Sequence, residues 1–376
     1  MRKQNTAELI IASSENDSNM LYATRFFAPD PFIFLKIPPK KFAVMNDLEL
    51  DRAKSRIKTC EVVSFSELAA KYGRGGTQPF SSADAAAVLL KKYRVNTVEV
   101  PVNFPIQYAD ALRKKGFRIT PRPNPFFKQR AIKKRGEIAE ITQTLRATEE
   151  ALSRAISVIK NSDILGGRLY HEGSLLTADI IKRTIHVALI EQDCLPDHTI
   201  VAPGVQGSEP HNEGSGPLFA DSPIVIDVFP RSMTSHYYAD ITRTVVRGKA
   251  SPKLRKMYAA VQGAQEIAFR MIRAGVDGKK VHAAVTKYFE KQGFKTGIRK
   301  GRLQGFTHST GHGLGLDVHE STRISPRSEI LKAGNVVTVE PGLYYPDIGG
   351  VRLEDLVVVT QNGCRNLTKL GKCLEL

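Results

Sequence analysis

Five ionisable residues beside short apolar runs or glycines constrain this 376-residue chain more than any other feature. Burying several unpaired carboxylates together is prohibitive unless cations compensate for their charge. Four carboxylates and one imidazole suit divalent ions such as Mn, Zn, Co or Fe(II). Four negative charges balance two such ions, so the pattern predicts a two-metal centre. The five residues are Asp227, Asp240, His312, Glu340 and Glu354.

The length of the chain predicts two domains, and its composition is ordinary for a globular protein. No apolar stretch approaches the ~18 residues needed to span a membrane, and the polar start of the chain lacks the apolar core of a signal peptide. The four cysteines include no CxxC pair. We therefore expect free thiols, no cysteine metal site and a cytoplasmic protein without membrane association.

The formal charge of +17 gathers most densely between Arg113 and Arg135, where no acidic residue occurs. A second basic cluster lies between Lys295 and Arg302. Nucleic-acid binding is one explanation, but no helix-turn-helix, zinc-finger or RNA-binding signature accompanies the charge. We interpret the basic stretches as solvated surface or as an attraction to anionic partners, and do not expect nucleic acid as a partner.

Residues 1–125 alternate short strands with helices, which predicts an α/β domain. Pro121, Pro123 and Pro125 then interrupt regular structure. We expect residues 126–135 to form a basic linker and residues 136–376 to form a second domain.

The second domain is expected to repeat the order helix, helix, strand, strand. Each half supplies two carboxylates, so two facing strand pairs would bring all four to one centre. The expected helices cover residues 136–160, 178–192, 252–272 and 276–292. The expected strands that carry the acids cover residues 224–228, 239–246, 336–340 and 350–360.

Four segments in this order resemble the signatures of the pita-bread metallopeptidases, and best those of the Xaa-Pro peptidase branch. That branch includes aminopeptidase P and proline dipeptidase. Residues 28–32 and 130–134 are similar to its creatinase-like N-terminal domain and to the start of its catalytic domain. The resemblance implies an α/β (α+β) chain with a creatinase-like N-terminal domain and a pita-bread domain of pseudo-two-fold halves. The four segments are Asp240–Thr244, His308–His319, Val339–Tyr344 and Val351–Asp355.

The resemblance implies a role for each predicted ligand. Asp227 would bind one metal ion, and Asp240 and Glu354 would bridge both. His312 and Glu340 would complete the shell of the second ion. Glu340 would also act as general acid and base beside the activated water.

Further site residues follow from the same motifs. His319 matches a histidine that polarises the substrate carbonyl, and His211 one that contacts the substrate near its leaving group. His308 matches a pocket histidine. Arg352 matches an arginine tied to the bridging carboxylates or to the substrate. Arg323, four residues after His319, could hold the C-terminal carboxylate of a dipeptide; an ordinary surface role is equally open.

Gly311, Gly313 and Gly315 do not form a phosphate-binding loop, because no Lys-Ser/Thr follows them. We expect them to allow close backbone approach beside a crowded site.

The expected activity is metal-dependent hydrolysis of the peptide bond before proline, with two divalent ions, Mn first and Co, Zn or Fe as alternatives. The motifs favour an Xaa-Pro aminopeptidase; an Xaa-Pro dipeptidase is the alternative, and a non-catalytic binding protein on the same fold is the third. The expected partners are peptides with proline at the second position and a second copy of the chain in a homodimer.

Overall fold

The computed structural model describes residues 6–73 and 79–376. The chain divides into two compact units, one ending at Lys128 and the other spanning Gln129–Leu376. The division falls inside the segment that we expected to be a linker. Phe126 and Phe127 pack into a core cluster of the first unit, and the first long helix of the second unit begins at Arg135.

The first unit is a six-stranded mixed sheet with the strand order β4-β3-β2-β1-β5-β6. Strand β1 pairs antiparallel with β2 and parallel with β5. The strands are β1 (Thr6–Ala12), β2 (Phe32–Ile37), β3 (Lys40–Met45), β4 (Glu61–Ser64), β5 (Thr97–Pro101) and β6 (Arg118–Arg122). The helices are α1 (Ser18–Thr24), α2 (Asp47–Arg56), α3 (Phe65–Tyr72), α4 (Ser82–Lys92) and α5 (Ile106–Lys114).

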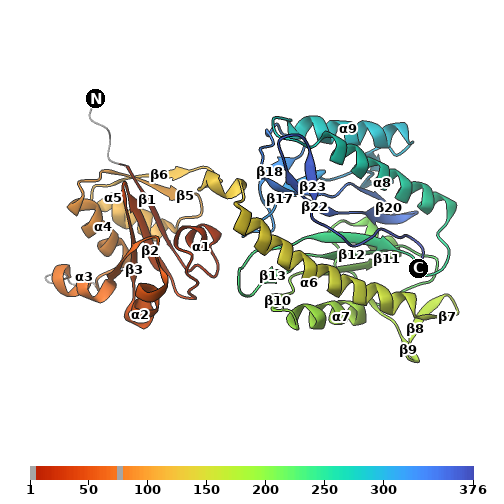
Figure 1. Cartoon of the computed structure of the whole chain (residues 1–376), viewed down its shortest axis with the longest axis horizontal. Helices are drawn as coiled ribbons and strands as arrows, with labels where there is room; N and C mark the ends of the chain where they lie inside the picture. Colours follow the sequence, from red (N-terminus) through yellow and green to blue (C-terminus); the bar gives the residue numbers. More distant parts are fainter. Residues whose placement is uncertain (1–5, 74–78) are drawn as a thin grey trace. The chain divides into compact units, whose positions relative to one another are not determined.

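Both faces of this sheet are buried. Leu9 and Ile11 of β1 pack into one core cluster with the alanines of α4, whereas Ile10 packs into another with Met20 of α1. Successive strand residues point to opposite faces, so a strand covered on both sides reads as a continuous apolar run. Figure 1 shows α1 and α4 on opposite sides of the sheet.

The second unit contains two helix pairs and several small sheets. The helices are η1 (Lys128–Ala131, at the unit boundary), α6 (Arg135–Lys160), α7 (Ala178–Ile190), η2 (Gly204–Ser208), α8 (Pro252–Met271) and α9 (Gly278–Lys291). The strands up to α8 are β7 (Asp163–Leu165), β8 (Arg168–His171), β9 (Ser174–Leu175), β10 (Cys194–Leu195), β11 (Ile200–Pro203), β12 (Ile224–Val228), β13 (Arg231–Ser232) and β14 (Ile241–Val245). The later strands are β15 (Gly297–Arg299), β16 (Arg302–Gln304), β17 (Gly311–Gly313), β18 (Glu320–Ile324), β19 (Val336–Val339), β20 (Gly342–Tyr345), β21 (Gly349–Arg352), β22 (Asp355–Val359) and β23 (Cys364–Asn366).

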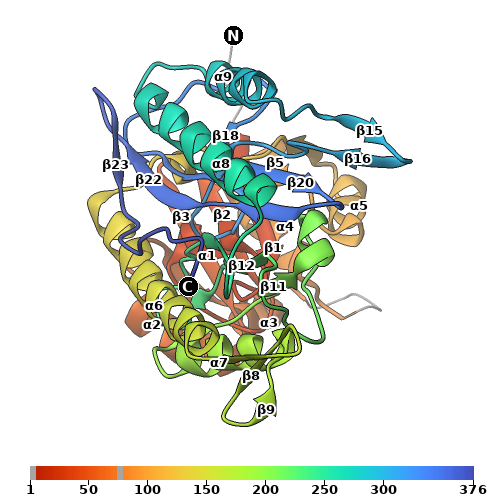
Figure 2. The same cartoon turned by 90° about the vertical axis from the view of Figure 1, so that its right-hand side faces the viewer.

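The two helix pairs of this unit lie on opposite sides of its main sheets. Figures 1 and 2 show α6 and α7 on one side and α8 and α9 on the other. The first half contributes the sheet β11-β12-β14, and the second contributes the sheet β18-β17-β19-β22-β23. The expected order of two helices followed by paired strands is present in both halves.

The expected strand 350–360 is wrong in one respect. The structure breaks it into β21 and β22, which pair with β20 and β19 respectively. The break lies at Leu353 and Glu354, where the backbone N–H of Glu354 donates to the carbonyl of Thr242 at 3.1 Å. Glu354 therefore contacts the first half of the unit.

The interpretation of the basic stretch as solvated surface is wrong for two of its members. Arg130 and Lys133 are buried and pair with Glu320. Arg113, Lys114 and other members of the stretch are exposed. In the part of the chain that the structure describes, no helix combines the length and apolar character that crossing a membrane requires. The four cysteines are free thiols, as expected.

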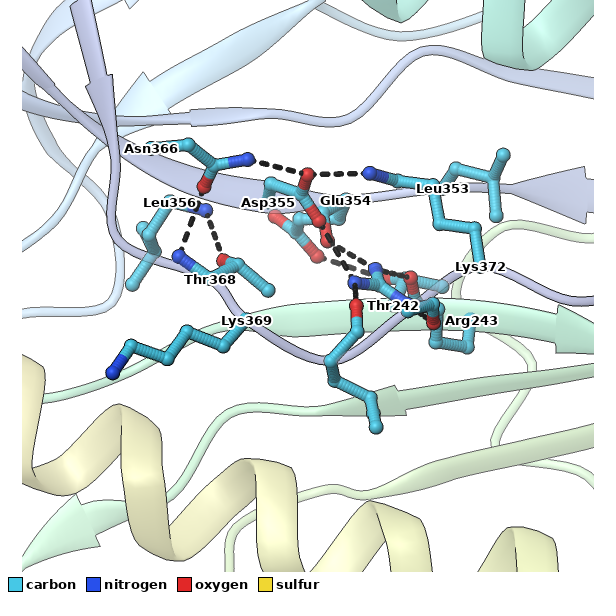
Figure 3. Close-up of polar contacts among 12 residues, drawn as sticks. Thr242, Arg243, Leu353, Glu354, Asp355, Leu356, Asn366, Thr368, Lys369 and Lys372 are labelled. Atoms are coloured by element: carbon cyan, nitrogen blue, oxygen red, sulfur yellow. Dashed lines mark hydrogen bonds and ion pairs between the residues drawn. The ribbon is translucent and has the colours of Figure 1, made fainter.

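A buried arginine joins the two halves of the second unit next to Glu354 (Figure 3). Arg243 of β14 is 2% exposed. Its Nη2 donates to Oδ1 of Asp355 in β22 at 2.9 Å, and its Nη1 donates to the carbonyl of Glu354 at 2.7 Å. The other carboxylate oxygen of Asp355 accepts from Lys372 at 2.6 Å and from Asn366 at 2.9 Å.

We predict that Arg243→Met lowers the free energy of unfolding of the second unit by about 3–5 kcal/mol, because it leaves the buried Asp355 carboxylate without its guanidinium partner. Urea denaturation followed by circular dichroism measures the change. Arg255→Met is the matched control: Arg255 pairs with Glu375 on the surface, where an ion pair contributes about 1 kcal/mol or less. Equal losses in both variants would contradict the prediction.

Candidate metal centre

The first two predicted ligands come from neighbouring antiparallel strands. Asp227 is the fourth residue of β12 and pairs in register with Thr242 of β14. Asp240 lies directly before β14. Both side chains are buried, with Asp227 8% and Asp240 4% exposed. The antiparallel pairing thus brings two acids that are thirteen positions apart to one end of the sheet.

The other three predicted ligands come from the second half. His312 is the central residue of β17 and is buried. Glu340 directly follows β19, and Glu354 directly precedes β22; these strands pair antiparallel, with Val339 opposite Asp355. Gln265 of α8 holds both strand ends, since its Nε2 donates to the carbonyls of Val339 at 2.8 Å and of Leu353 at 3.1 Å.

The side chains of the two halves meet. One ligand atom from each of Asp240, His312 and Glu354 lies within 4.8 Å of the others. Nε2 of His312 is 3.7 Å from Oδ2 of Asp240 and 3.6 Å from Oε1 of Glu340. All five predicted ligands line a single cavity of about 540 Å³.

The carboxylates leave buried oxygens without hydrogen-bond partners in the described structure: Oδ1 of Asp227, Oδ1 of Asp240 and Oε1 of Glu354. Burial, followed by the charge of Asp227, raises the pKa of Glu354 to about 8. Burial and the charge of Glu354 raise the pKa of Asp240 and of Glu340 well above their ordinary values. Buried polar groups normally have partners, so these oxygens and their shared charge fit divalent cations.

His312 has the tautomer that a metal ligand needs. Its Nδ1 lies 3.1 Å from the carbonyl of Gly313, so Nδ1 carries the proton and donates. Burial, followed by nearby His319, lowers the pKa of His312 to about 3, and the imidazole is neutral at pH 7. The lone pair of Nε2 therefore faces Asp240 and Glu340. Fixing the ligand nitrogen through a hydrogen bond on the other ring nitrogen is typical of metal-binding histidines.

Close packing explains all three glycines, as expected, since a Cβ atom on Gly313 would lie 2.3 Å from the carbonyl oxygen of Ser321 and one on Gly315 would lie 2.7 Å from Oε1 of Glu320. A Cβ atom on Gly311 would lie 1.9 Å from the carbonyl oxygen of Thr338. No side chain fits there, so glycine allows β17 to lie against β19 beside the site.

Arg352 forms an ion pair with Asp227 and hydrogen bonds with the groups around it. Its Nη2 donates to Oδ2 of Asp227 at 2.7 Å, and its Nε donates to Oγ1 of Thr242 at 3.2 Å. Its Nη1 donates to the hydroxyl of Tyr344 at 2.9 Å and to the carbonyl of Pro210 at 3.2 Å. The guanidinium is buried, and each of its nitrogens donates to a neighbouring side chain or carbonyl. Among the predicted ligands, Arg352 pairs with Asp227, whereas the motifs led us to expect a tie to the bridging acids Asp240 and Glu354 or to the substrate.

His308 extends this network. Its Nδ1 donates to the carbonyl of Ser309 at 2.8 Å, and its Nε2 lies 2.7 Å from the hydroxyl of Tyr344. Burial, followed by the charge of Arg352, lowers the pKa of His308 to about 3. Nε2 is therefore an acceptor, and Tyr344 donates to it. Tyr344 therefore joins His308 to Arg352 through its hydroxyl.

The remaining predicted site residues line the same cavity. His211, His319 and Arg323 all border it and are exposed. The ring of His319 packs edge-on against His312, with centroids 4.4 Å apart.

Sequence reasoning missed two residues at this cavity. His198 and Glu213 line it, and Nδ1 of His198 lies 2.8 Å from Oε1 of Glu213. Neither belongs to a recognisable motif, so nothing in the sequence pointed to them.

A family model described as "Metallopeptidase family M24" matches residues 139–361. The chain is 42% identical over 174 residues to "Uncharacterized peptidase YqhT" of Bacillus subtilis, covering 46% of this chain and 47% of that protein. It is 37% identical over 172 residues to an "Xaa-Pro dipeptidase" of Pyrococcus furiosus, covering 46% and 47%. The match thus spans about half the length of these curated relatives.

Two solved structures resemble nearly the whole chain. The Xaa-Pro dipeptidase from Bacillus anthracis has a TM-score of 0.82 at 24% identity, covering 98% of this chain and 95% of that one. The X-Pro aminopeptidase from Thermotoga maritima has a TM-score of 0.79 at 24% identity, covering 99% and 97%. At these identities the likeness concerns the fold, and it confirms the expected creatinase-like and pita-bread architecture. Because the family model covers more than half of the sequence, the chain belongs to metallopeptidase family M24.

Proposed function

We propose that this protein is a metal-dependent peptidase that hydrolyses the peptide bond preceding proline. The observation that carries the proposal is the convergence of Asp240, His312 and Glu354 within 4.8 Å, with buried carboxylate oxygens that have no hydrogen-bond partner among the described residues. Membership of family M24 and relatives named Xaa-Pro dipeptidase support the substrate class.

Asp227, Asp240, His312, Glu340 and Glu354 would hold two divalent cations, Mn first, with Co, Zn and Fe(II) as alternatives. Bound there, the cations would lower the pKa of a bound water molecule towards 7 and would stabilise negative charge on the reacting carbonyl oxygen. Glu340 is the most solvent-accessible of these acids, with 16% of its side chain exposed. It would accept a proton from water and pass it to the leaving nitrogen.

His319 and His211 border the cavity and would orient the substrate. Partial burial of the ring, followed by nearby Arg323, lowers the pKa of His319. The ring is then neutral and offers one N–H to the developing oxyanion. Arg352 would hold the Asp227 carboxylate in place. This complete set of groups favours an enzyme over a binding protein.

From the motifs we expected an aminopeptidase. Arg323 favours the dipeptidase, because its exposed side chain borders the cavity four residues after His319. A guanidinium there could bind the C-terminal carboxylate of an Xaa-Pro dipeptide, which a longer peptide does not present at that place. We therefore propose Xaa-Pro dipeptides as the preferred substrates, with longer Xaa-Pro peptides as the second candidate.

We predict that Asp240→Asn abolishes high-affinity binding of divalent metal, because it removes one of the charges that the cations balance. Metal content after dialysis, thermal unfolding with and without added Mn²⁺, and hydrolysis of Ala-Pro would all change together. Asp179→Asn is the control, since Asp179 is an exposed acid of α7. Full Ala-Pro hydrolysis by metal-free protein in chelator would contradict the proposed mechanism.

We predict that Arg323→Met raises the KM for Ala-Pro about 10–100-fold, the value of one charge-assisted hydrogen bond. The KM for Ala-Pro amide, which lacks the carboxylate, should stay within about 3-fold of wild type. Steady-state kinetics on the two substrates measure the difference. Equal effects on both substrates, or a wild-type preference for longer Xaa-Pro peptides, would favour the aminopeptidase.

A further inference from the structure

Glu320 directly follows His319 and is a buried carboxylate outside the predicted ligand set. Only 6% of its side chain is exposed. Its Oε2 accepts from Nζ of Lys133 at 2.8 Å, and its Oε1 accepts from Nη2 of Arg130. Glutamates are rarely buried unless they are paired. The ion pairs with Arg130 and Lys133 compensate for the burial of this carboxylate.

The same carboxylate closes the loop that joins β17 to β18. Its Oε1 also accepts from the backbone N–H of Leu316 at 2.9 Å and of Asp317 at 3.2 Å. Gly315 passes so close that an added Cβ would lie 2.7 Å from this oxygen. The carbonyl of Gly315 accepts from the backbone N–H of Tyr238 at 2.8 Å. The loop is therefore folded around Glu320 and tied to the segment before β14.

His319 lies in the part of this loop that Glu320 constrains. The amide of Asp317 before it and the carboxylate of Glu320 after it are both hydrogen-bonded in the same cluster. Its ring reaches the cavity and packs against His312.

The two cations are fixed in turn to the chain that leads into β19. The backbone N–H of Lys133 donates to the carbonyl of Gly334 at 2.8 Å. Nδ2 of Asn335 donates to the carbonyl of Ala131 at 2.6 Å. Strand β19 then leads to Glu340. The cluster thus connects the start of the second unit with two sides of the candidate site.

Electrostatics indicates that Glu320 holds structure and does not transfer protons. Burial alone would raise the pKa of Glu320, but Lys133 and Arg130 outweigh it and keep the pKa below its usual value. Arg130 also donates to Asp317 at 2.8 Å. Two cations thus face two carboxylates, and Glu320 stays ionised at neutral pH.

We propose that Glu320, held by Arg130 and Lys133, is a positioning residue that fixes His319 for the reaction, an inference that rests on the proposed peptidase function. The basic residues at the start of the second unit therefore serve the site through this carboxylate.

The test begins with Glu320→Gln, which keeps the shape of the side chain and removes its charge. We expect kcat for Ala-Pro to fall about 10–100-fold, as for residues that orient catalytic groups, while KM changes less than about 3-fold. Glu149→Gln is the matched control. Glu149 is another buried acid that pairs with one arginine, Arg146, and accepts two backbone N–H groups. Its replacement should leave kcat unchanged.

A double-mutant cycle separates positioning from a general loss of stability. If Glu320 acts through His319, then Glu320→Gln should have no further effect on kcat in the His319→Ala background. Additive losses would overturn the proposal, as would an unchanged kcat in either single variant. Lys133→Met, which removes one cation from the cluster, should reproduce the loss of kcat in the event that Glu320→Gln does not fold.

Hydrogen exchange of the 313–323 segment provides a readout that does not depend on activity. We expect Glu320→Gln to accelerate exchange of the Leu316 and Asp317 amides, and Glu149→Gln to leave them unchanged. Unaltered exchange in Glu320→Gln overturns the positioning role. Wild-type protein that carries metal but hydrolyses no Xaa-Pro peptide would instead contradict the proposed function, and the exchange result would still decide whether Glu320 holds the loop.

Discussion

Mutual repulsion among buried acids is the constraint on which the candidate site depends. Asp227, Asp240 and Glu354 each keep one buried oxygen without a hydrogen-bond partner in the described structure. Paired strands β12 and β14 carry Asp227 and Asp240, and Gln265 of α8 binds the carbonyl of Leu353 beside Glu354. Divalent cations bound among these acids would relieve their repulsion and would thereby stabilise the second unit.

That arrangement needs rigid supports, and the chain supplies them in pairs that join its two halves. Arg243 fastens β14 to Asp355, the residue after Glu354 (Figure 3). Arg352, two residues before Glu354, fastens β21 to Asp227. Each of these ion pairs therefore joins one half of the unit to the other, and both involve residues next to Glu354 in the sequence or two positions from it. A site assembled from two halves of a unit keeps its geometry only if such links resist separation.

The sequence predicted what depends on local pattern. The long helices, including α6 and α8, and the ends of β12 and β19 follow from apolar periodicity and from the cost of charge beside apolar runs. The break between β21 and β22 could not be predicted, because it depends on the contact of Glu354 with Thr242 from the other half. The positions of His198 and Glu213 at the cavity likewise depend on loops without a motif.

Charge was the least predictable property, because composition does not show which residues share a cluster. Arg130 and Lys133 lie in a run of ten basic residues that reads as solvated surface. The acid that neutralises them, Glu320, is almost 190 positions later and belongs to the loop beside His319. A buried ion pair contributes little net stability, because the cost of removing both charges from water offsets their attraction. Its value lies in specificity of position: the ionised Glu320 has one arrangement that satisfies two cations and two amides, and that arrangement fixes the loop at the cavity.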